Sequence, residues 1–389
     1  MHHSLIITML SSTTTFLLFL TIITATATTT SPSDISALKA IKSLINPNSI
    51  PSYSCLASWN FTSDPCQNPH ITHFLCGLSC SEFRITQLTF DRAGYTGSLS
   101  PSISQLTQLI TIDLSDNKLS GPIPISLFSL PNLQTLNLRS NLFSGPIPPS
   151  ISNLKSIQTI DISHNSLTMS IPDTFHSLLA LTRLDLSFNG LTGPIPSLPI
   201  NIIELAIKSN SLSGDLTKLS YTITENLEVI ELSNNSLTGT IPNWFFLQPS
   251  LQQVNLAYNK FTNLNIPKPV ESNLIAIDLG YNNIVGNLSP NFSTYPLLSS
   301  LSLSYNKLHG PIPAEFAKVR RLFLDGNYLS GLPPQEFFTA KSMVSGSLGD
   351  NCLKMCPISS QLCVKSQKPS SICQKSQYVV GGGKAKPKS

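Results

Sequence analysis

The 389-residue chain has little charge: Asp, Glu, Lys and Arg make up 11% of it, less than half the usual share. Its 24 basic and 20 acidic residues leave a net charge of +4, too small an excess for a chain-wide nucleic-acid binder. Hydrophobic residues reach 41%, so the chain can bury a sizeable core and global disorder is excluded. The 29 prolines argue against a long helical bundle.

Catalytic signatures are also missing. The chain contains no G-x-S-x-G, no H-E-x-x-H, no phosphate-binding loop and no protein-kinase signature. His164, His176 and His309 are far apart in sequence, with no evident carboxylate or nucleophile partner. We therefore expect neither enzymatic activity nor a cofactor.

Long apolar runs are confined to the N-terminus. Leu5–Met9 and Phe16–Ile23 are apolar, and Ala25-Thr26-Ala27 matches the small-residue pattern of a cleavage site. Residues 1–27 are therefore predicted to be a signal peptide, and the protein to be secreted into the extracellular space or cell wall. A membrane anchor is the alternative, but Thr13–Thr15 shortens the apolar run. No later stretch reaches eighteen apolar residues, so we expect no span in the mature chain.

The eight cysteines lie in two clusters of four, with none in the 271 residues between them. An even number in a secreted chain predicts disulfides, and each cluster allows three pairings. We expect four disulfides within two terminal caps, 28–84 and 341–373. The spacing of Cys66, His70, His73, Cys76 and Cys80 also suits zinc, but secretion favours disulfides, so no metal is expected. The clusters are Cys55, Cys66, Cys76, Cys80 and Cys352, Cys356, Cys363, Cys373.

Residues 85–340 repeat a short frame eleven times: two apolar residues flank one other residue, and three positions on stands an Asn in ten copies and Ala93 in the first. The spacing between successive Asn residues is 21 to 25. The two apolar side chains share one face of a short strand, and stacked strands about 4.8 Å apart form a parallel sheet. A buried Asn amide satisfies backbone groups of adjoining turns, so we assign it a structural role. The ladder comprises Asn117, Asn141, Asn165, Asn189, Asn210, Asn235, Asn259, Asn282, Asn306 and Asn327.

A second motif follows several of these Asn residues, as in Leu119-Ser-Gly-Pro-Ile-Pro124 and Leu191-Thr-Gly-Pro-Ile-Pro196. With the frame, it resembles the plant-type leucine-rich repeat of receptor-like kinases, receptor-like proteins and polygalacturonase-inhibiting proteins. Leu56-Ala-Ser-Trp59-Asn resembles the cap motif of that family, and Asp34–Ile45 has helical periodicity. The resemblance implies an α/β solenoid: a right-handed superhelix with a parallel sheet on its concave face and disulfide caps.

The outward strand positions form the candidate ligand-binding surface. An aromatic row occupies the position before the ladder Asn and could anchor a partner, although Tyr is common there in the family. Acidic residues between the two core positions form a stripe, but an acid is usual there too. Lys208 and Arg321 are further outward basic residues. Arg139, Arg183 and Lys208 lie among the acids, where pairing with those acids is the alternative to ligand contact. The candidates are Arg139, Asp161, Arg183, Asp185, Phe188, Glu231, Tyr258, Asp278, Tyr281 and Tyr305.

By resemblance, we expect a secreted protein that binds a protein or peptide ligand in extracellular signalling or defence. A signalling role would require a membrane receptor kinase as partner. The alternatives are a polygalacturonase-inhibitor-like protein, or a structural wall component held on pectin by a basic tail over residues 374–389, which we expect to be disordered. No nucleic-acid partner is expected. Glycosylation sequons begin at Asn60, Asn234, Asn287 and Asn291.

Overall fold

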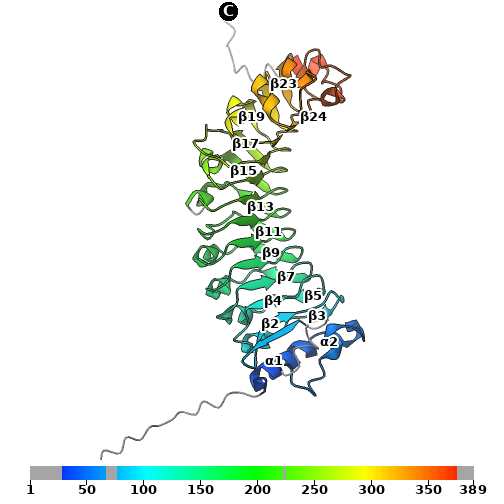
Figure 1. The fold of residues 1–389 in the computed structure, drawn as a ribbon, viewed down its shortest axis with the longest axis vertical. Helices are drawn as coiled ribbons and strands as arrows, with labels where there is room; N and C mark the ends of the chain where they lie inside the picture. The colour runs from blue at the N-terminus through cyan, green and yellow to red at the C-terminus, as the bar shows by residue number, and fades with distance from the viewer. Residues whose placement is uncertain (1–28, 67–76, 222–224, 375–389) are drawn as a thin grey trace, which may run out of the picture.

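The computed structural model describes residues 29–66, 77–221 and 225–374. The predicted signal peptide, Cys76 and residues 375–389 of the basic tail lie outside these ranges. Figure 1 shows the coils stacked in single file, from the cap holding α1 and α2 to the opposite cap beyond β23 and β24. The solenoid expected from the repeats is therefore confirmed.

One thirteen-stranded sheet lines the concave face. Its strands are parallel and pair in register, except for the antiparallel pair β1–β2 at the N-terminal edge. The strands are β1 (Leu78–Ser81), β2 (Arg84–Thr89), β4 (Thr111–Asp113), β6 (Thr135–Asn137), β8 (Thr159–Asp161), β10 (Arg183–Asp185), β12 (Glu204–Ala206), β14 (Val229–Glu231), β16 (Gln253–Asn255), β18 (Ala276–Asp278), β20 (Ser300–Ser302), β22 (Arg321–Phe323) and β24 (Ser345–Ser347).

Two shorter parallel sheets follow the Asn positions, where the chain turns away from the concave face. The eight-stranded sheet contains β3 (Thr96–Gly97), β5 (Lys118–Gly121), β7 (Leu142–Pro146), β9 (Ser166–Ser170), β11 (Gly190–Gly193), β13 (Ser211–Gly214), β15 (Ser236–Ile241) and β17 (Lys260–Leu264). The four-stranded sheet contains β19 (Val285–Asn287), β21 (Lys307–Gly310), β23 (Tyr328–Gly331) and β25 (Cys352–Leu353).

Short 3-10 helices complete most coils. Proline precedes or opens many of them, because its fixed φ suits the first turn of a helix. They are η1 (Pro47–Ser49), η2 (Pro101–Gln105), η3 (Ile125–Ser129), η4 (Pro149–Asn153), η5 (Asp173–Ser177), η6 (Thr217–Tyr221), η7 (Asn243–Leu247), η8 (Pro290–Thr294), η9 (Ala314–Lys318), η10 (Gln335–Phe338) and η11 (Gln361–Cys363).

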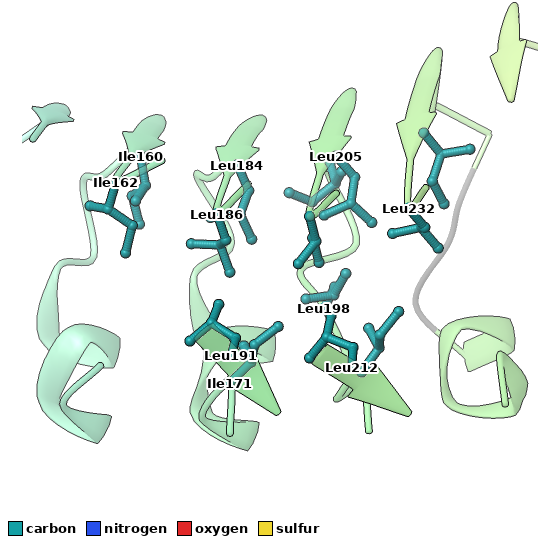
Figure 2. Packing of buried hydrophobic residues seen from close by; sticks show 14 of the residues in the cluster. Ile160, Ile162, Ile171, Leu184, Leu186, Leu191, Leu198, Leu205, Leu212 and Leu232 are labelled. Atoms are coloured by element: carbon teal, nitrogen blue, oxygen red, sulfur yellow. The ribbon is translucent and has the colours of Figure 1, made fainter. Parts of the chain in front are cut away.

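The core is a continuous column of aliphatic side chains, with the same position filled in successive coils. Figure 2 shows Ile160, Leu184 and Leu205 on neighbouring strands, with Ile162 and Leu186 below Ile160 and Leu184 in the view. Each of these side chains is at most 2% exposed. Burial on this scale contributes about 1.5–3 kcal/mol per side chain, which explains why the alternating frame fixes the register of the sheet.

The Asn residues join the coils as the sequence predicts. Asn141 is typical: its Nδ2 donates to the Leu138 and Arg139 carbonyls of its own coil and to the Leu114 carbonyl of the preceding coil. Its Oδ1 accepts from the Leu119 amide at 3.0 Å. The other nine ladder residues repeat this arrangement, as the bonds of Asn165 and Asn327 illustrate.

The array does not end at residue 340, where we placed the last repeat. A twelfth coil contains β24, and its buried Asn351 donates to the Leu324 carbonyl at 2.9 Å and accepts from the Leu329 amide at 3.1 Å. Gly346 occupies the first apolar position of the frame, which hid the repeat. A Cβ at Gly346 would lie 1.9 Å from the Leu322 carbonyl oxygen, so only glycine fits there.

The N-terminal cap packs a helix against the first strands. Helix α1 (Pro32–Ser43) starts two residues before the predicted segment, and α2 (Cys55–Ser58) follows it. Asp34 is fully buried and accepts bonds from Arg84 Nε, Arg84 Nη2 and the Ile85 amide at 2.9–3.0 Å. This ion pair ties α1 to β2, a connection that the helical periodicity alone did not reveal.

Among the described residues there are three disulfides, each within one cysteine cluster, as the clustering predicts. Cys66 bonds Cys80 in the N-terminal cap, and the C-terminal cap contains the pairs Cys352–Cys373 and Cys356–Cys363. The fourth predicted disulfide would use Cys55 and Cys76, and Cys76 lies outside the described residues. The caps cover the two open ends of the apolar column.

Candidate functional site

The three-residue strands of the concave sheet, from β4 to β22, each present two outward side chains around one buried residue. On β18, for example, Ala276 and Asp278 flank Ile277, which is 1% exposed. The second of these outward positions carries the acidic stripe. Its side chain commonly accepts a hydrogen bond from the amide two residues on, as Asp113, Asn137, Asp161, Asp185, Glu231, Asn255 and Asp278 do. The side chains of the stripe therefore stabilise the turn that ends each strand, whether or not they also bind a ligand.

Several charged side chains in the N-terminal half of this face interact with neighbours of opposite charge. Arg183 pairs with Glu204 across β10 and β12 at 2.7 Å, rather than with the neighbouring Asp185. Burial raises the pKa of Asp161, hydrogen bonds from Ser163 oppose the shift, and the Asp185 charge adds to it. The charge of Arg139 lowers the same pKa. Candidate residues of both signs are thus partly neutralised here.

The predicted aromatic row divides into two stacks. In the first, Phe188 lies on His164 with ring centroids 4.1 Å apart, and Lys208 Nζ sits 5.5 Å from the Phe188 ring centroid. The next two coils carry Ser209 and the exposed Asn234 in this position. The aromatic side chains therefore do not form one continuous surface.

The second stack contains Tyr258, Tyr281 and Tyr305. The ring centroids are 4.2 Å and 4.5 Å apart, with interplanar angles of 8° and 16°. All three residues have φ of 55–56°. Because the same backbone conformation recurs on consecutive coils, the rings stack face to face and direct their edges outward.

The C-terminal cap closes the end of this tyrosine stack. Lys365 Nζ lies 5.4 Å from the Tyr305 ring centroid and donates to the Tyr305 hydroxyl at 3.1 Å. It also pairs at 2.6 Å with Asp325, whose side chain is 6% exposed. The bond to Asp325, followed by the bond to Tyr305, raises the pKa of Lys365. The ammonium is therefore held charged at the end of the groove.

A groove of about 520 Å³ runs over β14 to β22 beside the tyrosine stack. Small side chains such as Ala276, Ser300 and Ser302 line it where other strands carry longer ones. The full lining is Val229, Ile230, Glu231, Gln253, Val254, Asn255, Ala276, Ile277, Asp278, Tyr281, Ser300, Ser302, Ser304, Tyr305, Phe323, Asp325 and Lys365.

Four of the ten candidate residues line this groove: Glu231, Asp278, Tyr281 and Tyr305. Tyr258 stacks on Tyr281 just outside the lining. The other five lie on strands or turns closer to the N-terminus: Arg139, Asp161, Arg183, Asp185 and Phe188.

Two residues at the C-terminal end of the groove, Asp325 and Lys365, are absent from the candidates drawn from the sequence. Asp325 stands where the preceding coils carry Ser304, Gly280 and Ala257, and that departure from small residues was a usable signal. Lys365 belongs to the cap and has no place in the repeat frame, so no periodic signal existed for it.

The sequon residues differ in their surroundings. Asn60, Asn234 and Asn287 are exposed, and Asn234 lies in the turn position between the two aromatic stacks. Asn291 is half-buried, and its Nδ2 donates to the Ile266 carbonyl at 2.8 Å. Among the described residues, no His, Cys, Asp and Glu side chains gather into a group able to hold a metal. The described part of the chain also has no helix both long and apolar enough to cross a membrane.

The coil geometry, Asn ladder and capped ends define a leucine-rich-repeat solenoid, and comparison with known proteins agrees. The leucine rich repeat model matches residues 93–143 and 148–191, and a second leucine rich repeat model matches 226–247 and 297–319. The leucine rich repeat N-terminal domain matches residues 31–72. The chain therefore contains leucine-rich repeats and has the fold of a leucine-rich-repeat solenoid.

Curated relatives are plant receptors, although the matched segments are short. Over 48 residues the chain is 50% identical to the LRR receptor-like serine/threonine-protein kinase GSO2 of Arabidopsis thaliana, and over 67 residues it is 40% identical to Receptor like protein 27. These matches cover 12% and 17% of the chain but only 4% and 8% of the relatives. The chain thus matches a small part of each relative.

Solved structures share much more of the fold. The plant peptide hormone receptor RGFR1, solved in complex with RGF2, is 33% identical with a TM-score of 0.62 over 66% of this chain and 42% of that one. The Arabidopsis thaliana GASSHO1/SCHENGEN3 ectodomain, solved with CASPARIAN STRIP INTEGRITY FACTOR 2, is 26% identical with a TM-score of 0.63, over 87% and 48%. A plant ice-binding protein is 22% identical with a TM-score of 0.59, over 88% and 99%, which shows the shared fold alone.

Proposed function

We propose that this protein is an extracellular, receptor-like binding protein whose concave groove over β14 to β22 holds a peptide ligand. The groove carries the proposal, because small side chains lie within it and a rigid edge of stacked tyrosines runs beside it. Aromatic side chains that are already ordered bind partners at a low entropy cost. RGFR1, a plant peptide hormone receptor that shares this fold, was solved in complex with RGF2, and this supports a peptide as the occupant.

A pair of matched substitutions tests the proposal. Ser300→Trp fills the groove from the first outward position of β20, and Thr135→Trp adds the same bulk at the equivalent position of β6. Peptides from the extracellular fluid of the source tissue would be captured on each variant and on the wild type, then identified by mass spectrometry. We expect Ser300→Trp to lose the captured peptides and Thr135→Trp to retain them. Equal retention by both variants would show that the groove is not the binding site.

A signalling role would add a membrane receptor kinase as partner. We would detect it as a protein crosslinked to the tagged chain in its own tissue only when the captured peptide is present. Polygalacturonase inhibition is the alternative for the same face. It would be supported if the purified chain slowed pectin hydrolysis by a polygalacturonase and Ser300→Trp removed the effect.

Attachment to the wall concerns the basic tail, of which residues 375–389 lie outside the described part of the chain. If the tail holds the protein on de-esterified pectin, binding should fall steeply as salt rises, because exposed charges are screened within about 8 Å at physiological salt. Truncation after Cys373 should abolish the retention. Equal retention of the full and truncated chains at low salt would exclude this attachment.

A further inference from the structure

The groove contains four charged groups, and three of them already have partners. Asp325 is neutralised by Lys365 at 2.6 Å. Glu231 uses both carboxylate oxygens, since Oε1 accepts from the Ser233 amide at 3.1 Å and Oε2 accepts from Asn255 Nδ2 at 2.9 Å. Within the described part of the chain, Asp278 is the carboxylate of the groove with an oxygen that accepts no hydrogen bond.

Asp278 accepts a hydrogen bond through Oδ1, from the Gly280 amide at 2.9 Å. Its second oxygen is available to a ligand. Along the sheet it pairs in register with Asn255 on β16 and Ser302 on β20, both uncharged. Arg321, the outward cation of β22, does not line the groove. A negative charge therefore stands in the groove beside polar neighbours that do not cancel it.

Tyr281, which also lines the groove, can offer a ligand its hydroxyl oxygen as an acceptor but not a face of its ring. Tyr281 is sandwiched between Tyr258 and Tyr305 at 4.2 Å and 4.5 Å, so both faces of its ring are covered. A ligand meets the ring edge and its hydroxyl oxygen. The carboxylate of Asp278, the Ser302 hydroxyl and the Tyr281 hydroxyl are all oxygen acceptors, which is the set that an ammonium or guanidinium donor requires.

We propose that the groove selects a peptide with a Lys or Arg side chain, and that Asp278 is the residue that binds it. This inference rests on the proposed peptide-binding function and names its ligand class. Small side chains on the same strands, Ala276 and Ser300, leave room for the aliphatic part of such a side chain.

The chain itself shows how to remove this charge without disturbing the fold. Asn137 and Asn255 occupy the equivalent position on β6 and β16, and each accepts the same amide bond at 3.1 Å through Oδ1. Asp278→Asn should therefore keep the turn and lose only the charge. Asp185→Asn is the matched control, because Asp185 makes the same bond to the Ser187 amide at 2.8 Å and lies outside the groove.

The experiment uses the full secreted chain and a soluble library of random heptapeptides. Peptides retained by immobilised wild type, Asp278→Asn, Asp185→Asn and Asp278→Lys would be sequenced by mass spectrometry. We expect Lys and Arg to be enriched about 5-fold on wild type and on Asp185→Asn, the effect of about 1 kcal/mol from one ion pair. Asp278→Asn should lose the enrichment, and Asp278→Lys should favour Asp and Glu instead.

Other outcomes distinguish failure of this inference from failure of the proposed peptide-binding function on which it rests. Peptide retention without preference for Lys or Arg would overturn the inference and leave peptide binding intact. Equal enrichment on wild type and Asp278→Asn would overturn the role of Asp278. Retention of no peptide by any variant would overturn both the inference and the proposed function.

Discussion

Replacing Asn165 with alanine tests the structural role of the ladder in the middle of the array. Its Oδ1 accepts from the Phe143 amide at 2.9 Å, and its Nδ2 donates to the carbonyls of Leu138, Ile162 and Ser163. Alanine removes all four bonds and adds no steric clash. The substitution should therefore weaken the contact between the coils that carry Phe143 and Asn165.

The size of the effect follows from which groups keep another partner. The Leu138 carbonyl still accepts from Asn141 Nδ2, the Ile162 carbonyl from Asn189 Nδ2, and the Ser163 carbonyl from the Ser140 amide. The Phe143 amide loses the side-chain acceptor that satisfies it. One unsatisfied buried donor costs about 1–3 kcal/mol, so we expect unfolding free energy to fall by about 2 kcal/mol.

Urea unfolding followed by circular dichroism measures this loss, and hydrogen exchange of peptides containing Phe143 locates it. Asn132→Ala is the control, because Asn132 is exposed and bonds the Thr107 carbonyl at 3.2 Å from the surface. Surface changes of this kind cost within about 0.5 kcal/mol. Equal stability of the two variants, with unchanged exchange at Phe143, would refute the structural role of the ladder.

Three further changes have defined outcomes. Lys365→Met should lower unfolding free energy by about 1–2 kcal/mol, because the buried Asp325 loses its cationic partner and keeps only the hydrogen bond from Ser304 Oγ. Lys365→Met combined with Asp325→Ser, the residue of the preceding coil, should restore most of this loss in urea melts. Asp34→Ala should free α1 from β2, exposing Arg84 and the Ile85 amide, and limited proteolysis should then cut within residues 32–43 faster than in wild type. Asp161→Asn should raise the melting temperature at pH 7, because the raised pKa of Asp161 means that its charged form costs folding free energy. Protonation of Asp161 removes this cost completely below the pKa of about 3.9 in the unfolded chain, and the benefit is lost as pH rises through the folded pKa. The gain in melting temperature from Asp161→Asn should therefore shrink towards zero as pH falls below about 4. A gain that does not change with pH would contradict a raised pKa for Asp161.

The repeats were predictable because local sequence and global packing require the same residues. An apolar-x-apolar frame followed by Asn specifies a strand, its buried face and its register, and each further copy adds to the signal. The twelfth coil escaped for a local reason. Gly346 replaces the first apolar residue because the Leu322 carbonyl leaves no space for a side chain, so the frame fails where the fold continues.

The site was less predictable, since it depends on contacts between coils rather than on one coil. Asp278 and Asp185 look the same in sequence, and both close their strand with the same backbone bond. What separates them is their surroundings in the folded sheet. Lys365 is 60 residues from Tyr305 in sequence, and no repeat frame connects the two.

Charge distribution supports the proposal that the groove, rather than the whole concave face, binds the ligand. In the N-terminal half, Arg183 already pairs with Glu204, and Arg139 lies close enough to lower the pKa of Asp161. A ligand would have to displace these internal partners, and an exchange of one surface ion pair for another gains little. In the groove, Lys365 is committed to Asp325, so Asp278 can form a new pair without breaking an old one. Solenoid faces of uniform sequence pattern thus acquire a local preference through the few charges that the fold leaves unmatched.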